Sequence, residues 1–115
     1  MPVVLVIARD WALRTSVRAE LLEIGIHAMG IESPDEVRRI IATGQLPAAI
    51  VVEACAGLAD DPRIFNLIAR VPAVLIASRV ETVPLPPAAA VFYRPVRIGE
   101  IIAKVLEVAK KGRAA

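Results

Sequence analysis

The hydrophobic residues of the chain gather in five short aliphatic runs. Most of these runs follow or precede a proline, which fixes φ and removes a backbone donor, and which therefore collects at the edges of strands and helices. A continuous aliphatic run is typical of a strand that is buried on both faces of a parallel sheet. The pattern therefore predicts strands over Val3–Ala8, His27–Ile31, Ala48–Glu53, Ala73–Ser78 and Val91–Tyr93.

Segments with helical spacing lie between these runs. Gly25 and Gly44 follow the first two of them, at positions where a helix end favours a positive φ. Ser33, Pro34 and Glu36 resemble a capping box with proline in the first turn, which predicts the start of the second helix. A third helix is expected to start near Asp61-Pro62, and the last helix is expected over Arg97–Lys110. The predicted apolar faces are Leu13, Val17, Leu21 and Ile24; Val37, Ile40 and Ile41; Ile64, Phe65 and Ile68; and Ile98, Ile101, Ile102, Val105 and Ala109.

One connection between strands lacks a helical pattern. Residues Arg79–Ala90 link the fourth and fifth predicted strands and contain Pro84, Pro86 and Pro87. Three prolines so close together exclude a helix interior and push the residues before them toward extended conformations. We therefore expect an extended loop with at most one helical turn in this connection.

The alternation of strands and helices predicts an α/β fold with a doubly wound parallel sheet of five strands. The flavodoxin-like strand order 2-1-3-4-5 is the commonest one for this pattern. A length of 115 residues fits a single domain over 1–115, and one cysteine excludes an internal disulfide. Hydrophobic runs of about seven residues are too short to cross a bilayer and no signal peptide is visible, so a cytoplasmic protein without membrane contact is expected.

Ligands of open parallel sheets bind beyond the carboxyl ends of the strands. In this chain those ends carry Ala8-Arg9-Asp10, Glu53-Ala54, Ala77-Ser78 and Tyr93-Arg94. Asp10 is also placed to cap the first helix, and capping is the more favoured of its two readings, ahead of metal binding. The chemistry of the protein is expected at this edge of the sheet.

Along essentially its whole length, the chain resembles a bacterial response-regulator receiver domain (CheY-like). The resemblance rests on the first-helix segment Trp11–Gly25, on the strand Ala48–Glu53, on the strand Ala73–Ser78 and on the pair Arg94-Pro95, which stands where receivers carry Lys-Pro. It implies two-component signal transduction, with a phosphoacceptor aspartate, an acidic pair for Mg²⁺, a hydroxyl switch residue and an aromatic switch residue.

The residues at the functional positions depart from the receiver pattern. Glu53 stands at the phosphoacceptor position, and Ala8 and Arg9 stand at the acidic pair, with Asp10 next to them. The hydroxyl switch position holds Ala77 or Ser78, and the aromatic switch position holds Val91 or Phe92. Arg94 replaces the lysine before Pro95.

These departures predict a degenerate or pseudo-receiver. Mg²⁺ requires carboxylate and water oxygens, and a methyl group with a guanidinium supplies neither. We expect no conventional phosphorylation, no cofactor and no metal. Arg9 and Arg94 are both expected to project toward the Glu53 carboxylate, where a guanidinium would replace the cation. Glu53 then acts as a phosphomimetic charge or remains as a relic, and the sequence leaves both readings open.

The remaining candidate residues carry weaker signals. Cys55 has no second cysteine or histidine nearby, and His27 lies on a predicted edge strand without a ligand partner. No glycine-rich nucleotide motif is present. The basic residues Lys104 and Lys110 are interrupted by acidic ones and the net charge is only +2, which disfavours nucleic-acid binding.

The sequence therefore predicts a non-enzymatic signalling domain that acts through protein contacts. The partner would be a kinase, a regulator or a second copy of the chain, and the candidate interface is Val83, Leu85, Val96 and Ile98, unless the proline-rich loop instead folds back over the sheet edge. Two alternatives stay open: a phosphorylatable receiver that uses Asp10 and Glu53, and a small anion- or nucleotide-binding protein that uses Arg9 and Arg94.

Overall fold

A computed structural model describes residues 3–80 and 83–114 of the chain. Its strands are β1 (Val3–Ile7), β2 (His27–Ile31), β3 (Ala49–Ala54), β4 (Ala73–Ala77) and β5 (Ala90–Tyr93), and its helices are α1 (Trp11–Glu23), α2 (Pro34–Ile41), α3 (Pro62–Arg70) and α4 (Ile98–Ala114). The strands pair in parallel in the order β2-β1-β3-β4-β5. This confirms the predicted flavodoxin-like sheet and strand order.

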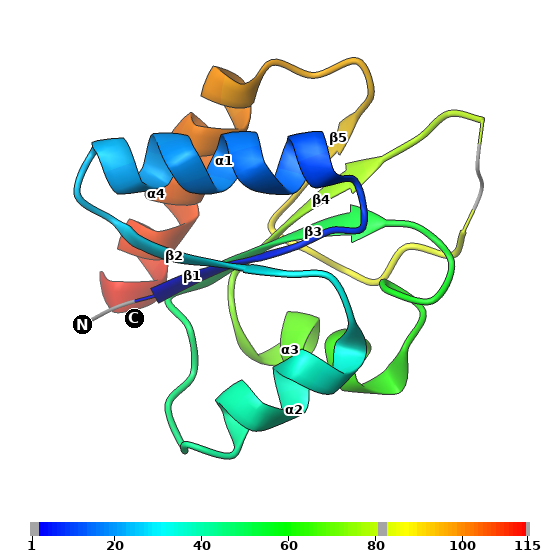
Figure 1. Cartoon of the computed structure of the whole chain (residues 1–115), viewed down its shortest axis with the longest axis horizontal. Coiled ribbons are helices and arrows are strands. Elements are labelled where there is room, and N and C mark those ends of the chain that lie inside the picture. Colours follow the sequence, from blue (N-terminus) through cyan, green and yellow to red (C-terminus); the bar gives the residue numbers. More distant parts are fainter. Residues whose placement is uncertain (1–2, 81–82, 115) are drawn as a thin grey trace.

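Helices cover both faces of the sheet, α1 and α4 on one face and α2 and α3 on the other (Figure 1). Alternate residues of each strand point into the two layers, so that Val4 and Val6 pack under α1 while Leu5 and Ile7 pack under α2 and α3. The central strands are therefore buried on both sides, which explains their continuous aliphatic runs. Within the part of the chain that the structure describes, no helix is both long and apolar enough to cross a bilayer.

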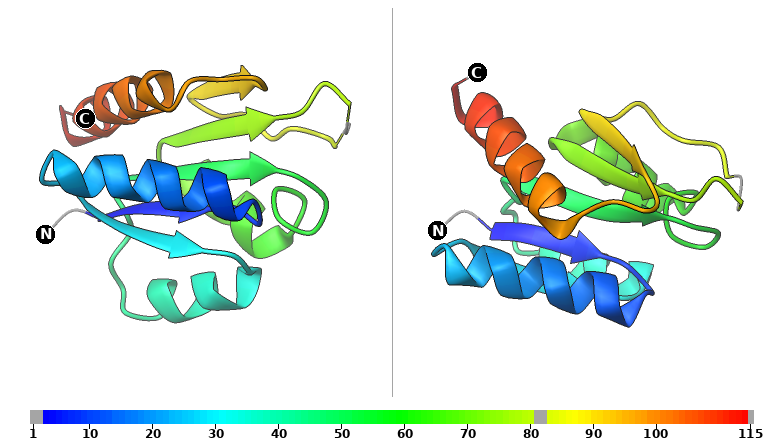
Figure 2. Two further views of the ribbon diagram at one scale, coloured as in Figure 1. Left: turned by 45° about the horizontal axis from the view of Figure 1, so that its top comes forward. Right: turned by 90° about the horizontal axis from the view of Figure 1, so that it is seen from above.

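The connection between β4 and β5 has no helix in its described residues, 78–80 and 83–89, as the three prolines predict. It runs as an extended loop beyond the end of the sheet and returns to β5 (Figure 2). Val83, Leu85 and Ala88 are half-buried against the apolar layer under α3, and Pro86 is buried. The loop therefore folds back over the sheet, and Val83 and Leu85 do not form the exposed patch that the sequence also allowed.

The helix starts follow the sequence signals in part. Asp61 caps α3 with Pro62 in its first turn, and Pro34 opens α2. The predicted capping box at Ser33 is wrong, because the Ser33 side chain makes no capping hydrogen bond. Glu36 Oε1 instead accepts a hydrogen bond from the backbone N–H of Glu32 at 3.3 Å.

Two predicted core residues lie outside the core. Ile24 is 53% exposed because it occupies the C-cap of α1, where the chain already turns toward β2. Phe65 is 45% exposed because Ile64, Leu67 and Ile68 form the inner face of α3, and Phe65 lies to one side of that face. The apolar spacing thus predicted the helices, but it extended the buried face of α1 past its end and placed Phe65 rather than Leu67 on the buried face of α3.

Candidate functional site

Three charged side chains meet at the carboxyl edge of the sheet. Glu53 is the last but one residue of β3, and Arg94 directly follows β5. Asp10 is the N-cap of α1, in the short connection from β1. β1 lies beside β3, and β4 separates β3 from β5, so the parallel topology alone brings these strand ends together. We call the group of Asp10, Glu53 and Arg94 the clasp.

The Glu53 carboxylate is held by backbone amides on one side and by a guanidinium on the other. Its Oε1 accepts hydrogen bonds from the N–H of Arg9 at 2.8 Å and from the N–H of Asp10 at 3.0 Å. Its Oε2 accepts one from Arg94 Nη2 at 3.2 Å. The side chain is 16% exposed, so these partners replace most of the water that a free carboxylate would bind.

Arg94 bridges two carboxylates with its two terminal nitrogens. Nη1 donates to Asp10 Oδ2 at 2.8 Å while Nη2 donates to Glu53 Oε2. The planar guanidinium suits this arrangement, because its donors diverge in a rigid fork. The backbone N–H of Arg94 also donates to the carbonyl of Ala77 at 2.9 Å, which anchors the residue to the end of β4.

Asp10 has two structural partners at once. Its Oδ1 accepts a hydrogen bond from the Leu13 N–H at 3.2 Å, which is the predicted capping interaction. This backbone hydrogen bond, together with the hydrogen bond from Arg94, holds the pKa of the Asp10 carboxyl below its usual value. The sequence predicted the cap and missed the ion pair with Arg94.

The Arg9 side chain does not reach Glu53, and the prediction that both arginines project toward this carboxylate is wrong for Arg9. Its Nη1 donates to the backbone carbonyl of Ala56 at 2.8 Å, and the guanidinium lies over Gly57. Gly57 has φ +85°, and a Cβ there would collide with the Arg9 guanidinium. Arg9 contacts Glu53 through its backbone N–H, which donates to the carboxylate and which any residue other than proline would provide.

The other predicted positions at this edge have separate environments. Ala77 is buried, and the Ser78 hydroxyl oxygen accepts a hydrogen bond from the Val80 N–H at 3.1 Å. Phe92 packs against the layer of α1 and α4. Val91 points to the opposite face and is 38% exposed.

The residues on either side of Arg94 in the sequence differ in their exposure to solvent. Tyr93 is exposed and lies under the Arg79 guanidinium, 5.2 Å from its ring centroid. Pro95 follows Arg94 through a cis peptide bond. Val96 and Ile98 are half-buried against the layer of α1 and α4, so this half of the predicted interface is only partly accessible.

A divalent cation does not fit the clasp. Each of the four carboxylate oxygens of Asp10 and Glu53 already accepts a hydrogen bond from an N–H of the protein. Arg94 places a positive charge between the two carboxylates, where Mg²⁺ would need to bind carboxylate oxygens. Among the described residues, no group of three or more His, Cys, Asp or Glu side chains is arranged to hold a metal.

Comparisons with known proteins were made by sequence and by structure. No protein-family model matches the sequence. The comparison with curated proteins likewise gives no match.

Solved structures with the same fold are numerous. A response regulator receiver domain protein (CheY-like) from Methanospirillum hungatei JF-1 aligns with TM-score 0.80 and 13% identity, over 99% of this chain and 98% of that one. The signal receiver domain of an HD domain-containing protein from Pseudomonas fluorescens Pf-5 aligns with TM-score 0.79 and 9% identity, over 99% and 98%. The N-terminal domain of a response regulator/sensory box/GGDEF 3-domain protein from Carboxydothermus hydrogenoformans aligns with TM-score 0.78 and 13% identity, over 97% of each chain. The chain thus shares the fold of receiver domains.

Proposed function

We propose that the chain is a receiver-like signalling domain over residues 1–115 that acts through contacts with other proteins and without phosphoryl transfer. On this proposal it is not an enzyme, and its partner is a signalling kinase, a regulator or a second copy of itself. The receiver fold supports the signalling class. The observation that carries the rest is the clasp, in which Arg94 binds both carboxylates at the edge where receiver chemistry would occur.

The chemistry of phosphoryl transfer explains why the clasp opposes it. An attacking carboxylate needs a free oxygen lone pair, and the developing charge on the phosphoryl group needs a cation and oriented donors. The two lone pairs of Glu53 Oε1 are engaged by two backbone N–H groups, and Oε2, which accepts one hydrogen bond, faces the Arg94 guanidinium, whose positive charge weakens it as a nucleophile. Glutamate is also one methylene longer than aspartate, so its carboxylate reaches past the usual reacting position and into the amides at the start of α1.

In place of a reversible charge, the clasp provides a permanent one. Glu53 ties the end of β3 to the start of α1, and Arg94 ties both to the end of β5. We propose that this fixes the strand ends and the β5 surface in a single arrangement that a partner recognises.

The proposed contact surface lies on β5 and the segment that follows it. Val91 and Tyr93 are exposed there, on the side of the sheet where the described residues of the connection from β4 form no helix. Arg79 over the Tyr93 ring adds a cationic group to this apolar surface. Val96 and Ile98 lie on the other face of the sheet, half-buried in the layer of α1 and α4.

The proposal is tested by titrating the isotopically labelled chain with Mg²⁺ and following backbone amide shifts by NMR. We expect the amide shifts of Arg9, Asp10 and Glu53 to stay unchanged up to millimolar Mg²⁺. The Arg94→Met variant is the matched comparison, because it removes the cation that competes with the metal. Saturable shifts of these three amides in the unmodified chain would contradict the proposal.

A further inference from the structure

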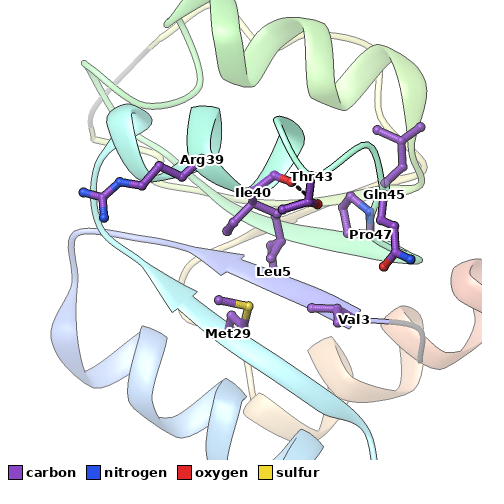
Figure 3. A pocket seen from close by; sticks show the side chains of 9 residues that line it. Val3, Leu5, Met29, Arg39, Ile40, Thr43, Gln45 and Pro47 are labelled. Carbon is purple, nitrogen blue, oxygen red and sulfur yellow. Dashed lines mark hydrogen bonds between the residues drawn. The ribbon is translucent and has the colours of Figure 1, made fainter.

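A groove lies on the opposite half of the sheet from the clasp, between α2 and the edge strand β2 (Figure 3). Its volume is about 280 Å³, close to the lower end of the range for ligand-binding clefts. We call it the α2 groove, and it is lined by Val3, Leu5, Met29, Arg39, Ile40, Thr43, Gln45, Leu46 and Pro47.

The groove exists because α2 is short and because β2, as an edge strand, pairs only with β1. α2 spans only eight residues and ends at Ile41, and Gly44, with φ +83°, then turns the chain toward Pro47. The segment from Thr43 to Pro47 forms one wall and leaves the β1 side chains Val3 and Leu5 as the floor. Met29 on β2 and Leu46 on the wall stay about 40% exposed at the rim, so the groove offers apolar surface to a partner.

The polar groups of the groove lie at its two ends. Arg39 extends from one end and Gln45 lies at the other, with Leu5, Ile40 and Met29 between them (Figure 3). The Thr43 hydroxyl is already used, because it donates to the Ile40 carbonyl at 2.7 Å. A ligand therefore meets an apolar centre with a guanidinium at one end.

The charge around the groove is positive. No aspartate or glutamate lines it, and Arg39 forms no ion pair with any residue in the described part of the chain. The two acids of α2 are engaged elsewhere, since Asp35 pairs with Arg63 and Glu36 accepts the Glu32 N–H.

We propose that the α2 groove is a docking site for a segment of a partner protein that presents a large apolar side chain next to a carboxylate. The apolar side chain would fill the space over Val3 and Leu5, and the carboxylate would pair with Arg39. Anchoring of one large apolar residue in a pocket with a charged rim is a common arrangement in protein interfaces. This inference is independent of the clasp and of the proposed loss of phosphoryl transfer.

A second copy of the chain is a poorer occupant. Its most exposed aromatic residue is Trp11, which follows Asp10. The Asp10 carboxylate is bound to Arg94 and to the Leu13 N–H, so it is not available to Arg39 of another molecule. A second copy therefore could not dock through its Trp11 segment, and the test below separates docking of its other exposed segments, such as Leu22 to Ile24, from binding of a different protein.

The experiment titrates the full-length, isotopically labelled chain with three short capped peptides and follows its amide shifts by NMR. The peptides are Asp-Phe-Asp, Lys-Phe-Lys and Asp-Ala-Asp. We expect saturable shifts at Met29, Thr43 and Gln45 with Asp-Phe-Asp. The other two peptides should bind several-fold more weakly, and raised salt should weaken the Asp-Phe-Asp complex.

Two neighbouring arginines supply a matched pair of variants. Arg39→Gln should weaken Asp-Phe-Asp binding by about two- to fivefold, the contribution of a partly solvated ion pair. Arg38→Gln should leave it unchanged, because Arg38 lies on the other side of α2, in the groove toward α3. The amide spectra of both variants report whether the fold is intact.

Several outcomes overturn the proposal. These are the absence of saturable shifts around the groove at the highest peptide concentration, equal binding of Asp-Phe-Asp and Lys-Phe-Lys, equal effects of the two arginine variants, or concentration-dependent shifts of the groove amides without any peptide. The last result would assign the groove to a second copy of the chain.

Discussion

Arg94 and Asp10, 84 positions apart in the sequence, are joined by an ion pair in which Arg94 Nη1 lies 2.8 Å from Asp10 Oδ2. Arg94 directly follows β5 and Asp10 caps α1, so the pair connects the end of the last strand to the first helix. Because the same guanidinium also binds Glu53, a single residue links the end of β5 to the end of β3 and to the start of α1.

Replacing Arg94 should therefore destabilise the chain. Arg94→Met leaves two carboxylates close together without their shared cation, and we expect the free energy of unfolding to fall by about 1–2 kcal/mol, given that the group is about one-third exposed. Urea unfolding followed by circular dichroism measures this. Arg97→Met is the control, since Arg97 is exposed and near the same edge. An equal loss in both variants would mean that the clasp contributes nothing specific.

The length of the Glu53 side chain should be essential for its amide contacts. Glu53→Asp shortens the side chain by one methylene, so its carboxylate should no longer reach the N–H groups of Arg9 and Asp10. We expect the exchange of these two amide protons with solvent to accelerate by about tenfold, which corresponds to roughly 1.4 kcal/mol of lost protection. Hydrogen exchange measured by NMR tests this, with the Leu5 amide in the buried strand as an internal reference. Unchanged exchange at Arg9 and Asp10 would show that the carboxylate does not hold them.

The clasp should make stability depend on pH in the acidic range. The pKa of Asp10 is lower in the folded chain than its usual value of 3.8, because the Leu13 N–H and Arg94 favour the ionised form. The resulting stabilisation is complete above that usual value, and it is lost as the pH falls through 3.8 toward the lower pKa of the folded state. Asp61, whose pKa Arg63 lowers, contributes in the same direction.

The variant Asp10→Asn separates these contributions. Asparagine still caps a helix but has no charge to titrate. We expect its unfolding free energy to decline less steeply between about pH 5 and pH 2 than that of the unmodified chain, while Asp61 supplies the remaining slope. Parallel urea titrations at several pH values measure both slopes. If the unfolding free energies of the variant and of the unmodified chain depend on pH equally, then Asp10 does not contribute to the loss of stability in acid.

Gly57 should tolerate substitution less well than Gly44. Both have positive φ, so alanine at either position costs about 1 kcal/mol of backbone strain. A Cβ at Gly44 meets open space, whereas a Cβ at Gly57 collides with the Arg9 guanidinium and displaces it from the Ala56 carbonyl. Gly57→Ala should therefore lower the free energy of unfolding by roughly 0.5 kcal/mol more than Gly44→Ala does.

A double-mutant cycle checks the cause of that difference. In an Arg9→Ala background the guanidinium is absent, so Gly57→Ala and Gly44→Ala should destabilise the chain equally. The unfolding free energies of the single and double variants provide the comparison. If the excess cost at Gly57 persists without Arg9, then it does not arise from this contact.

The fold could be predicted from the sequence because its signals are local and repeated. Prolines before the strands, aliphatic runs and helical spacing each indicate an element, and the alternation of elements indicates the sheet. The absence of a helix from the described residues between β4 and β5 followed from Pro84, Pro86 and Pro87, since a proline disrupts the helical turn in which it lies. Phe65 was placed in the core because the pattern of a nine-residue helix does not decide whether Phe65 or Leu67 joins Ile64 and Ile68 on the buried face.

The site could be predicted only in part. Parallel topology brings strand ends together, which led to Glu53 and Arg94. The direction of the Arg9 side chain depends on the loop around Gly57, and nothing in the residues near Arg9 signals that contact. The ion pair of Asp10 with Arg94 was missed because the capping role of Asp10 already explained why an acidic residue stands there. The positive charge of Arg94 at the same edge of the sheet was nevertheless a signal for this pair.

The most direct measurement of the central claim is the intact mass of the chain after incubation with acetyl phosphate and Mg²⁺. The account predicts no phosphoryl adduct, because Arg94 and two backbone amides occupy the Glu53 carboxylate. A receiver with the usual aspartate, treated in parallel, shows that the reagent is active. An adduct that forms on the unmodified chain and disappears in Glu53→Gln would contradict the account.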